Sequence, residues 1–276
     1  MQGKWQEKIW NGMFWLSGII ITLILAVIII YIIYRGFSSV NFNFIFSAPS
    51  RAGKAGGIST TIIGTLYLTA VALLIAVPIG VATAIYLEQY ARRSSRLAYL
   101  INLTNDTLAG VPSILFGLFG FVFFVIFLNM GWSVLSGGMT LALMILPTIT
   151  RTAQEAVKSV PDEYLENSLA LGAGRWISIK RVILPSALPG IITGIILSMG
   201  RAVGETAAVI LTAGSSLNMP MSLTDPARSM SVHLYILATE GLSLERAFGT
   251  AFLIIIFILI INYLANLSLR SWSRQT

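Results

Sequence analysis

Six stretches of this sequence contain no Asp, Glu, Lys or Arg, and they limit what the chain can fold into. The uncharged stretches are residues 9–34, 55–87, 107–150, 182–200, 206–224 and 247–269. A helix needs about 20 apolar residues to cross the hydrocarbon core of a bilayer. Only 11% of the residues are charged and 56% are hydrophobic. The pattern is typical of an all-α protein that crosses the membrane several times.

We predict six spans, and the fifth of them crosses a short charged interruption. The predicted spans are residues 14–34, 62–87, 107–128, 134–152, 187–213 and 248–268. The first is too long for a signal peptide and lacks a small-residue cleavage site, so we expect it to be a permanent span. Gly110 and Pro112 should break or kink the third. We divide the chain into a first span with its outer loop, residues 1–57, and a core, residues 58–276.

The cations are distributed unevenly between the predicted loops. Those predicted on the inner side are Lys4, Lys8, Arg92, Arg93, Arg96, Arg151, Lys158, Arg175, Lys180, Arg181, Arg270 and Arg274. Those predicted on the outer side are Arg35, Arg51, Lys54, Arg228 and Arg246. This bias follows the positive-inside rule and predicts that both termini are cytoplasmic. The net charge of +7 therefore sets the membrane topology, and we expect no nucleic-acid partner.

Composition and motifs argue against catalysis by this chain. The sequence has no cysteine, so it has neither disulfides nor cysteine-ligated metal sites, and one histidine, His233, cannot build a zinc site. The stretch APSRAGKA departs from a phosphate-binding P-loop at Ala48 and Ala55. We also find no set of nucleophile and base. We therefore predict no catalytic residues, no metal site and no ATPase site.

A hydrophilic segment between the fourth and fifth spans, residues 151–185, has clear helix signals. Pro161 followed by Asp162 and Glu163 indicates a helix start, and Gly172 indicates its end. A second short helix should occupy about 174–183. From the pattern alone, the two helices could form a docking knob or an elbow lying on the lipid headgroups.

The same segment resembles the EAA loop of ABC-importer permeases. That pattern is Glu-Ala-Ala, three residues, Gly, nine residues, Ile, one residue, Leu-Pro, and this chain reads ENSLALGAGRWISIKRVILP. The matching positions are Glu166, Gly172, Val182, Leu184 and Pro185, with Val182 replacing Ile and Asn167 and Ser168 replacing the two alanines. Residues 64–91, 108–124, 146–161 and 200–213 resemble permeases of phosphate importers, of the PstA type more than the PstC type.

The resemblance implies a small (type I) ABC-importer permease in a bacterial cytoplasmic membrane, with this loop as the coupling helix. The residues expected to couple to the ATPase are Glu166, Leu169, Gly172, Ala173, Arg175, Trp176, Leu184 and Pro185. Implied partners are a homologous PstC-type permease, two ATP-binding subunits, a periplasmic or lipid-anchored phosphate-binding protein, and membrane lipid. ATP and magnesium are expected on the partner subunits, and no cofactor on this chain.

The stretch RAVGETAAV places Arg201 and Glu205 within the fifth span. An arginine at the centre of a span costs about 2.5–3.5 kcal/mol on insertion scales. At i,i+4 spacing the two side chains could form a pair that only fixes helix packing. Alternatively, Arg201 binds a passing oxyanion through bidentate hydrogen bonds, and Glu205 holds Arg201 while the path is empty. We place Ser198, Arg201, Glu205, Thr206 and Asp106 along the substrate path.

We also make predictions for one acidic residue and one glycine pattern of the spans. Asp106 could be a helix cap, or it could accept the proton of a hydrogen phosphate, which sulfate lacks. Gly190 and Gly194 form a GxxxG pattern suited to close helix packing.

The function we predict is transport of inorganic phosphate as a permease subunit of an ATP-driven importer, by alternating access. One alternative keeps this architecture for sulfate or molybdate. A second is an ATP-independent secondary transporter or channel whose intramembrane carboxylates relay protons.

Overall fold

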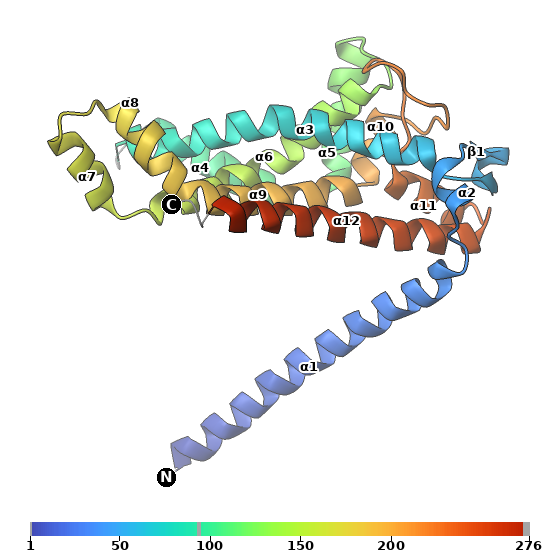
Figure 1. The fold of residues 1–276 in the computed structure, drawn as a ribbon, viewed down its shortest axis with the longest axis horizontal. Helices are drawn as coiled ribbons and strands as arrows, with labels where there is room; N and C mark the ends of the chain where they lie inside the picture. Colours follow the sequence, from blue (N-terminus) through green and yellow to red (C-terminus); the bar gives the residue numbers. More distant parts are fainter. Residues whose placement is uncertain (1, 93–94, 273–276) are drawn as a thin grey trace.

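The computed structural model describes residues 2–92 and 95–272, and most of that length is helical (Figure 1). The helices of the membrane region are α1 (Gln2–Phe37), α3 (Ser59–Ile85), α4 (Arg96–Ala109), α5 (Ser113–Gly120), α6 (Val134–Lys158), α9 (Leu184–Gly204), α10 (Ala207–Thr212) and α12 (Leu244–Trp272). The shorter elements are α2 (Phe42–Phe46), β1 (Pro49–Ser50), β2 (Ala55–Gly56), α7 (Asp162–Ala170), α8 (Arg175–Ser178) and α11 (Met230–Thr239). π-Helical segments are Tyr86–Tyr90, Phe121–Phe127 and Ile179–Ile183.

The described residues include five helices long and apolar enough to cross a membrane, and a sixth span if one bent pair is counted as one. The five are Trp10–Phe37, Ser59–Tyr90, Val134–Lys158, Arg175–Gly204 and Leu244–Leu264. The bent pair is Arg96–Ala109 with Ser113–Phe127, at 105°. The all-α, roughly six-span fold is confirmed.

For the third span, the predicted start of the helix was wrong and the predicted break was right. The helix begins at Arg96, because the Ser95 hydroxyl accepts a hydrogen bond from the backbone N–H of Ala98 and caps it. It ends at Ala109, and the chain turns sharply before Ser113. The expected break at Gly110 and Pro112 is confirmed.

The fifth predicted span was wrong at both ends. The short helix expected at about 174–183 is no separate element, because it continues through Pro185 into α9. In a regular α-helix, the ring of a proline collides with the carbonyl four residues earlier. A π-helical turn, Ile179–Ile183, precedes Pro185, and the helix continues through both. At the other end the helix stops at Gly204, and α10 is a separate piece.

The core lies where α3, α6 and α9 approach each other closely. Leu68, Leu141 and Ile145 are buried between these helices. Glycines allow the approach: a Cβ at Gly80 would lie 2.8 Å from Ile149, and one at Gly190 would lie 2.6 Å from Ala156. A Cβ at Gly194 would likewise overlap Thr152, so the close packing expected of the GxxxG pattern is confirmed.

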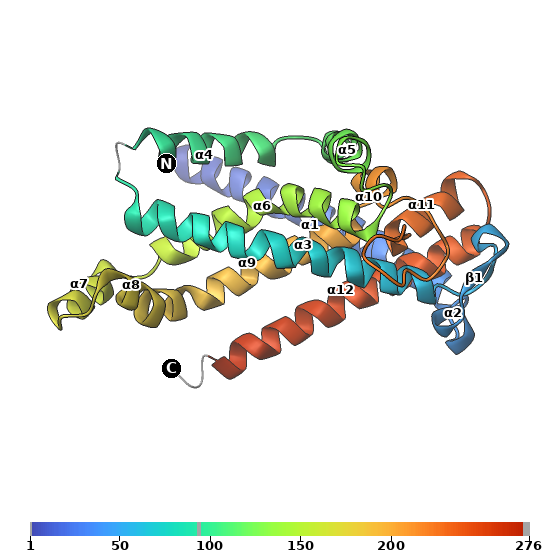
Figure 2. The same ribbon diagram turned by 90° about the horizontal axis from the view of Figure 1, so that it is seen from above.

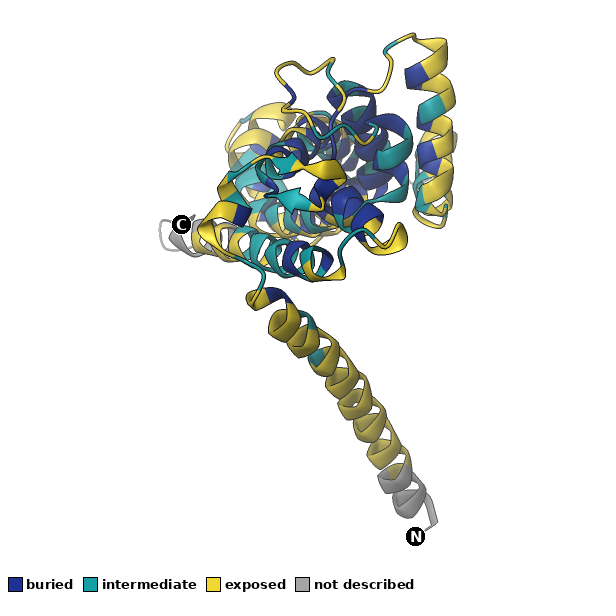
Figure 3. Cartoon of the chain, turned by 90° about the vertical axis from the view of Figure 1, so that its right-hand side faces the viewer, coloured by how far each residue is buried: buried dark blue, intermediate teal, exposed yellow. Residues whose placement is uncertain are grey.

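Helix α1 leaves the bundle after touching only its edge (Figures 1 and 3). Near its C-terminal end, Tyr31 packs edge-on against Phe248 and Phe37 against Phe252 of α12, with ring centroids 5.5 and 6.1 Å apart. Its most apolar stretch is otherwise exposed. The long apolar surface must be covered by lipid or by another subunit.

The two ends of the bundle carry different structures. Helices α7 and α8 project from one end, and the β1–β2 hairpin, α2 and α11 lie at the other (Figures 1 and 2). The start of α1 and the end of α12 point toward the same end as α7 and α8. That this end faces the cytoplasm stays a prediction from the charge distribution.

Candidate functional site

Arg201 lies in the last turn of α9 with its side chain exposed. Its neighbours Ala202 and Val203 are buried, so the guanidinium stands at the edge of the packed face of the helix. Among the residues that the structure describes, none forms an ion pair or a hydrogen bond with the Arg201 side chain. A guanidinium with five free donors at a spanning helix is suited to hold an oxyanion.

Glu205 does not pair with Arg201, so the expected i,i+4 ion pair is wrong for this conformation. The spacing brings two side chains together only on a continuous helix, and α9 ends before Glu205, whose backbone is extended. The carboxylate instead accepts a hydrogen bond from the N–H of Ala208 at 3.4 Å, at the start of α10. The backbone carbonyl of Glu205 accepts a hydrogen bond from the Ser231 hydroxyl at 2.6 Å.

The other two expected path residues of this region have different surroundings. Thr206 is half-buried at the start of α10, and its side chain does not cap that helix. Ser198 is fully buried, and its hydroxyl has no hydrogen-bond partner among the described residues. Ser198 therefore lies on the packed face of α9, one turn away from the exposed guanidinium of Arg201.

Asp106 takes part in an exposed ion network between α4 and α6. Its Oδ1 lies 3.7 Å from Nη1 of Arg151, and Nε of Arg151 donates to Oε1 of Glu155 at 3.2 Å. From the sequence we predicted only that Arg151 is one of the cations on the inner side of the membrane. The Arg151–Glu155 spacing of four residues was a signal for one pair, but the contact with Asp106 depends on how α4 packs on α6.

Arg151 and Arg201 lie at different depths of the bundle. Gly190 faces Ala156 and Gly194 faces Thr152, so α6 and α9 run antiparallel in a fixed register. In this register Arg201 lies at the level of residue 145 of α6. Arg151 is six residues further along, about 9 Å closer to the α7–α8 end at 1.5 Å per residue.

The exposed residues Asp106, Arg151 and Glu155 form a charged strip between α4 and α6, here called the α4–α6 strip. A polar cavity adjoins this strip on the side toward the α7–α8 end. The cavity has a volume of about 610 Å³. It is lined by Tyr99 and Asn102 of α4 and by Gln154 and Lys158 of α6. Helix α4 has no buried residue. Exposed charges and amides of this kind are costly against lipid, so this strip should face water or another protein.

The α7–α8 knob, residues 162–178, is held by local hydrogen bonds. Gly172 turns the chain between the helices with φ of +84°, a conformation that favours glycine. The Ser168 hydroxyl donates to the Ser178 hydroxyl at 2.8 Å and joins α7 to α8. The helix start at Asp162 and the stop before Gly172 are confirmed.

The residues expected to couple to the ATPase divide into two groups. The first group is exposed on the knob and consists of Glu166, Leu169, Gly172, Arg175 and Trp176, with the half-buried Ala173 between them. Leu184 and Pro185 are half-buried at the start of α9 and anchor the knob to the bundle. The prediction missed Leu171, whose apolar side chain is 89% exposed at the tip of the knob.

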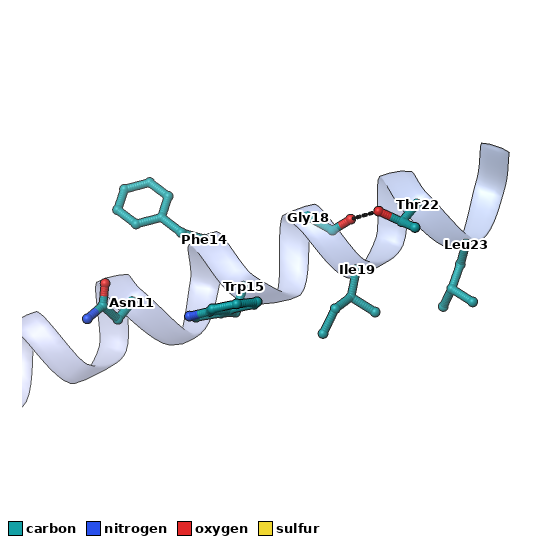
Figure 4. A pocket seen from close by; sticks show the side chains of 7 residues that line it. All are labelled: Asn11, Phe14, Trp15, Gly18, Ile19, Thr22 and Leu23. Atoms are coloured by element: carbon teal, nitrogen blue, oxygen red, sulfur yellow. Dashed lines mark hydrogen bonds between the residues drawn. The ribbon is translucent and has the colours of Figure 1, made fainter. Parts of the chain in front are cut away.

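A hollow of about 560 Å³ on α1 is lined by one helix alone (Figure 4). Its lining residues are Asn11, Phe14, Trp15, Gly18, Ile19, Thr22 and Leu23. The Thr22 hydroxyl donates to the Gly18 carbonyl of the same helix at 2.8 Å. Since no second element of the described chain lines it, this face fits a lipid chain or a neighbouring helix, and we assign no substrate site to it.

The fold and the exposed knob define a membrane permease, and sequence comparison gives its family. Residues 76–274 match the family described as the binding-protein-dependent transport system inner membrane component. The chain belongs to this family, and it is a multi-pass permease of the ABC-importer class. Its membership argues against the self-energised transporter or channel considered above.

Similar proteins include several permeases. The chain is 34% identical to the probable ABC transporter permease protein YqgI of Bacillus subtilis, with 96% of each chain covered. It is 38% identical to the phosphate transport system permease protein PstA 1 of Mycobacterium tuberculosis, over 76% of this chain and 70% of the relative.

Solved structures share the fold. A bacterial ABC transporter involved in importing the acidic polysaccharide alginate matches with a TM-score of 0.67, 16% identity and coverage of 97% and 99%. The inward-facing MetNI methionine transporter matches with a TM-score of 0.63, 17% identity and coverage of 78% and 94%. These similarities establish the type I importer permease fold.

Proposed function

We propose that this chain is the PstA-type permease subunit of an importer that moves inorganic phosphate across the cytoplasmic membrane. The observation that carries the proposal is the exposed, unpaired guanidinium of Arg201 on a spanning helix. A tetrahedral oxyanion can accept two of its N–H groups at once. Relatives named as phosphate permeases, at up to 38% identity, support phosphate as that oxyanion.

The path would run from Arg201 toward the Asp106–Arg151–Glu155 network. Glu205 leaves Arg201 free in this conformation, because its carboxylate caps α10. At the inner level Asp106 and Glu155 compete with the anion for Arg151. Such competition weakens binding, which suits a path that must release its cargo.

The chain would work with partner subunits. A homologous permease would cover the α4–α6 strip and complete the path, and two ATP-binding subunits would dock on the knobs. A phosphate-binding protein would deliver the anion at the opposite end. ATP and magnesium would bind the partner subunits, and this chain would transmit their motion without covalent catalysis.

The test is ATP-driven phosphate uptake by the assembled complex in vesicles. Arg201→Ala should lower uptake at least tenfold while assembly and ATP hydrolysis persist, because only the anion contact is removed. Arg201→Lys should retain part of the uptake, since it keeps the charge and loses the bidentate geometry. Arg35→Ala, which removes an arginine from α1, is the matched control and should leave uptake unchanged.

Two outcomes would count against the proposal. Unchanged uptake in Arg201→Ala would make the guanidinium a packing feature. If the wild-type complex takes up sulfate or molybdate faster than phosphate, the cargo is a different oxyanion. The proposed importer architecture would not be affected by that result.

A further inference from the structure

The C-terminal end of α3 changes from an α-helix to a π-helical turn, Tyr86–Tyr90, where it passes between the knob and α6. The turn closes with a hydrogen bond from the N–H of Ala91 to the carbonyl of Tyr86 at 2.9 Å. Leu87 is buried in this turn, whereas Glu88 and Gln89 are only half-buried.

One side of this turn is held by the knob. Nη2 of Arg175, the first residue of α8, donates to the backbone carbonyl of Gln89. The same guanidinium lies 5.5 Å from the ring centroid of Tyr90, a cation–π contact. Trp176 lines an apolar groove together with Tyr86 and Tyr90. A displacement of α8 therefore acts directly on the π-helical turn.

The other side of the turn is held by α6. Nε2 of Gln154 donates to Oε1 of Glu88 at 2.8 Å, across 66 residues of sequence. Gln154 is one turn from Arg151, which pairs with Asp106 of α4. Both partners of the bridge line the 610 Å³ polar cavity. The hydrogen bond thus lies at the wall of this cavity and not in the close-packed core.

We infer that the Glu88–Gln154 bridge and the Arg175 contact transmit motion of the ATPase-docking knob to Arg151 on α6. The knob has three connections to the spans. Two are covalent: α7 follows α6 through residues 159–161, and α8 continues into α9 and reaches Arg201. The third runs from Arg175 through the π-helical turn to Glu88 and Gln154, and it braces α6 one turn from Arg151. One movement of the knob would then shift both arginines, and this inference rests on the proposed transport function.

Glu88 and Gln154 are positioning residues in this scheme. Neither needs to touch the cargo, and their removal should change how transport follows hydrolysis rather than hydrolysis itself. If the bridge merely tied two helices together, its loss would lower assembly or stability, and uptake and hydrolysis would fall in parallel.

The experiment measures anion uptake per ATP hydrolysed by the assembled complex in proteoliposomes. Glu88→Ala and Gln154→Ala should each lower this ratio at least fivefold with hydrolysis retained. The double variant should be no worse than either single variant, because both remove one interaction. Glu88→Gln keeps an acceptor oxygen for Gln154 and should keep the ratio. Glu245→Ala, at the start of α12, is the carboxylate control and should behave as wild type.

The inference is overturned if the ratio stays at the wild-type value in both alanine variants, or if uptake and hydrolysis fall together. Additive effects in the double variant would also overturn it. If phosphate is not the cargo, the result is different, because the wild-type complex then hydrolyses ATP without taking up phosphate. In that case the same variants are compared with whichever oxyanion the wild type does transport.

Discussion

The imidazole of His233 shows how a buried residue's protonation follows from its neighbours. His233 lies on α11, outside the candidate spans, and is 1% exposed. Nη1 of Arg228 lies 3.4 Å from Nδ1 of His233. A guanidinium has only donors, so Nδ1 accepts and the ring is neutral, with its proton on Nε2. Burial, and then the positive charges of Arg228 and Arg246, lower the pKa of His233 from 6.5 to about 4.

This shift predicts a pH dependence of stability. Between pH 6.5 and about 4 the unfolded chain binds a proton that the folded chain does not, so stability falls as the pH falls through this window. The loss is about 1.4 kcal/mol per unit of pKa shift. In thermal unfolding of the purified protein in detergent, His233→Gln should flatten the dependence relative to wild type. Parallel curves would show that His233 does not contribute.

At the scale of helices, the distance between α3 and α6 is set by glycine. A Cβ at Gly138 would overlap the side chain of Val71, with its Cβ only 2.6 Å away. On α9, by contrast, a Cβ at Gly200 would meet nothing within 4 Å. The same substitution should therefore act in opposite directions at these two helical positions.

Gly138→Ala should destabilise the protein by about 1–3 kcal/mol through overpacking. Gly200→Ala should be neutral or should stabilise by up to about 1 kcal/mol, because alanine loses less backbone entropy in a helix. Thermal unfolding of both variants measures the contrast. Equal shifts would mean that α3 and α6 can separate without cost.

At the scale of the whole molecule, three surfaces lack a cover within the described chain. They are the apolar length of α1, the charged α4–α6 strip, and the knob with Leu171 at its tip. An apolar side chain that is 89% exposed contributes little to the stability of its own chain. Leu171 should therefore matter only in the assembly.

Leu171→Asp should weaken binding of the ATP-binding subunits at least tenfold and leave thermal unfolding of the isolated chain unchanged. The matched control is Leu223→Asp, which makes the same change at an exposed leucine in the loop between α10 and α11. Co-purification of the subunits with each variant gives the comparison. Full retention of the ATP-binding subunits by Leu171→Asp would place their docking surface elsewhere.

Properties carried by the local sequence were predictable. The uncharged runs determined the membrane class and the approximate number of spans, because lipid tolerates few charges in a helix. Gly110 and Pro112 determined the break in the third span, and Pro161 and Gly172 determined the ends of α7. The EAA-loop spacing located the knob. Each of these signals lies within a few residues of the feature that it predicts.

Only the tertiary structure decided which charges meet. The i,i+4 rule predicted an Arg201–Glu205 pair, but α9 ends at Gly204 and Glu205 is drawn to α10 and α11. Asp106 meets Arg151 because α4 packs on α6, and Glu88 meets Gln154 because α3 does. Periodicity describes one helix at a time, whereas these contacts depend on how two helices approach across 45 and 66 residues of sequence. The sequence by itself therefore determined the membrane helices and the knob, and the packing of those helices decided which charged and polar side chains meet between them.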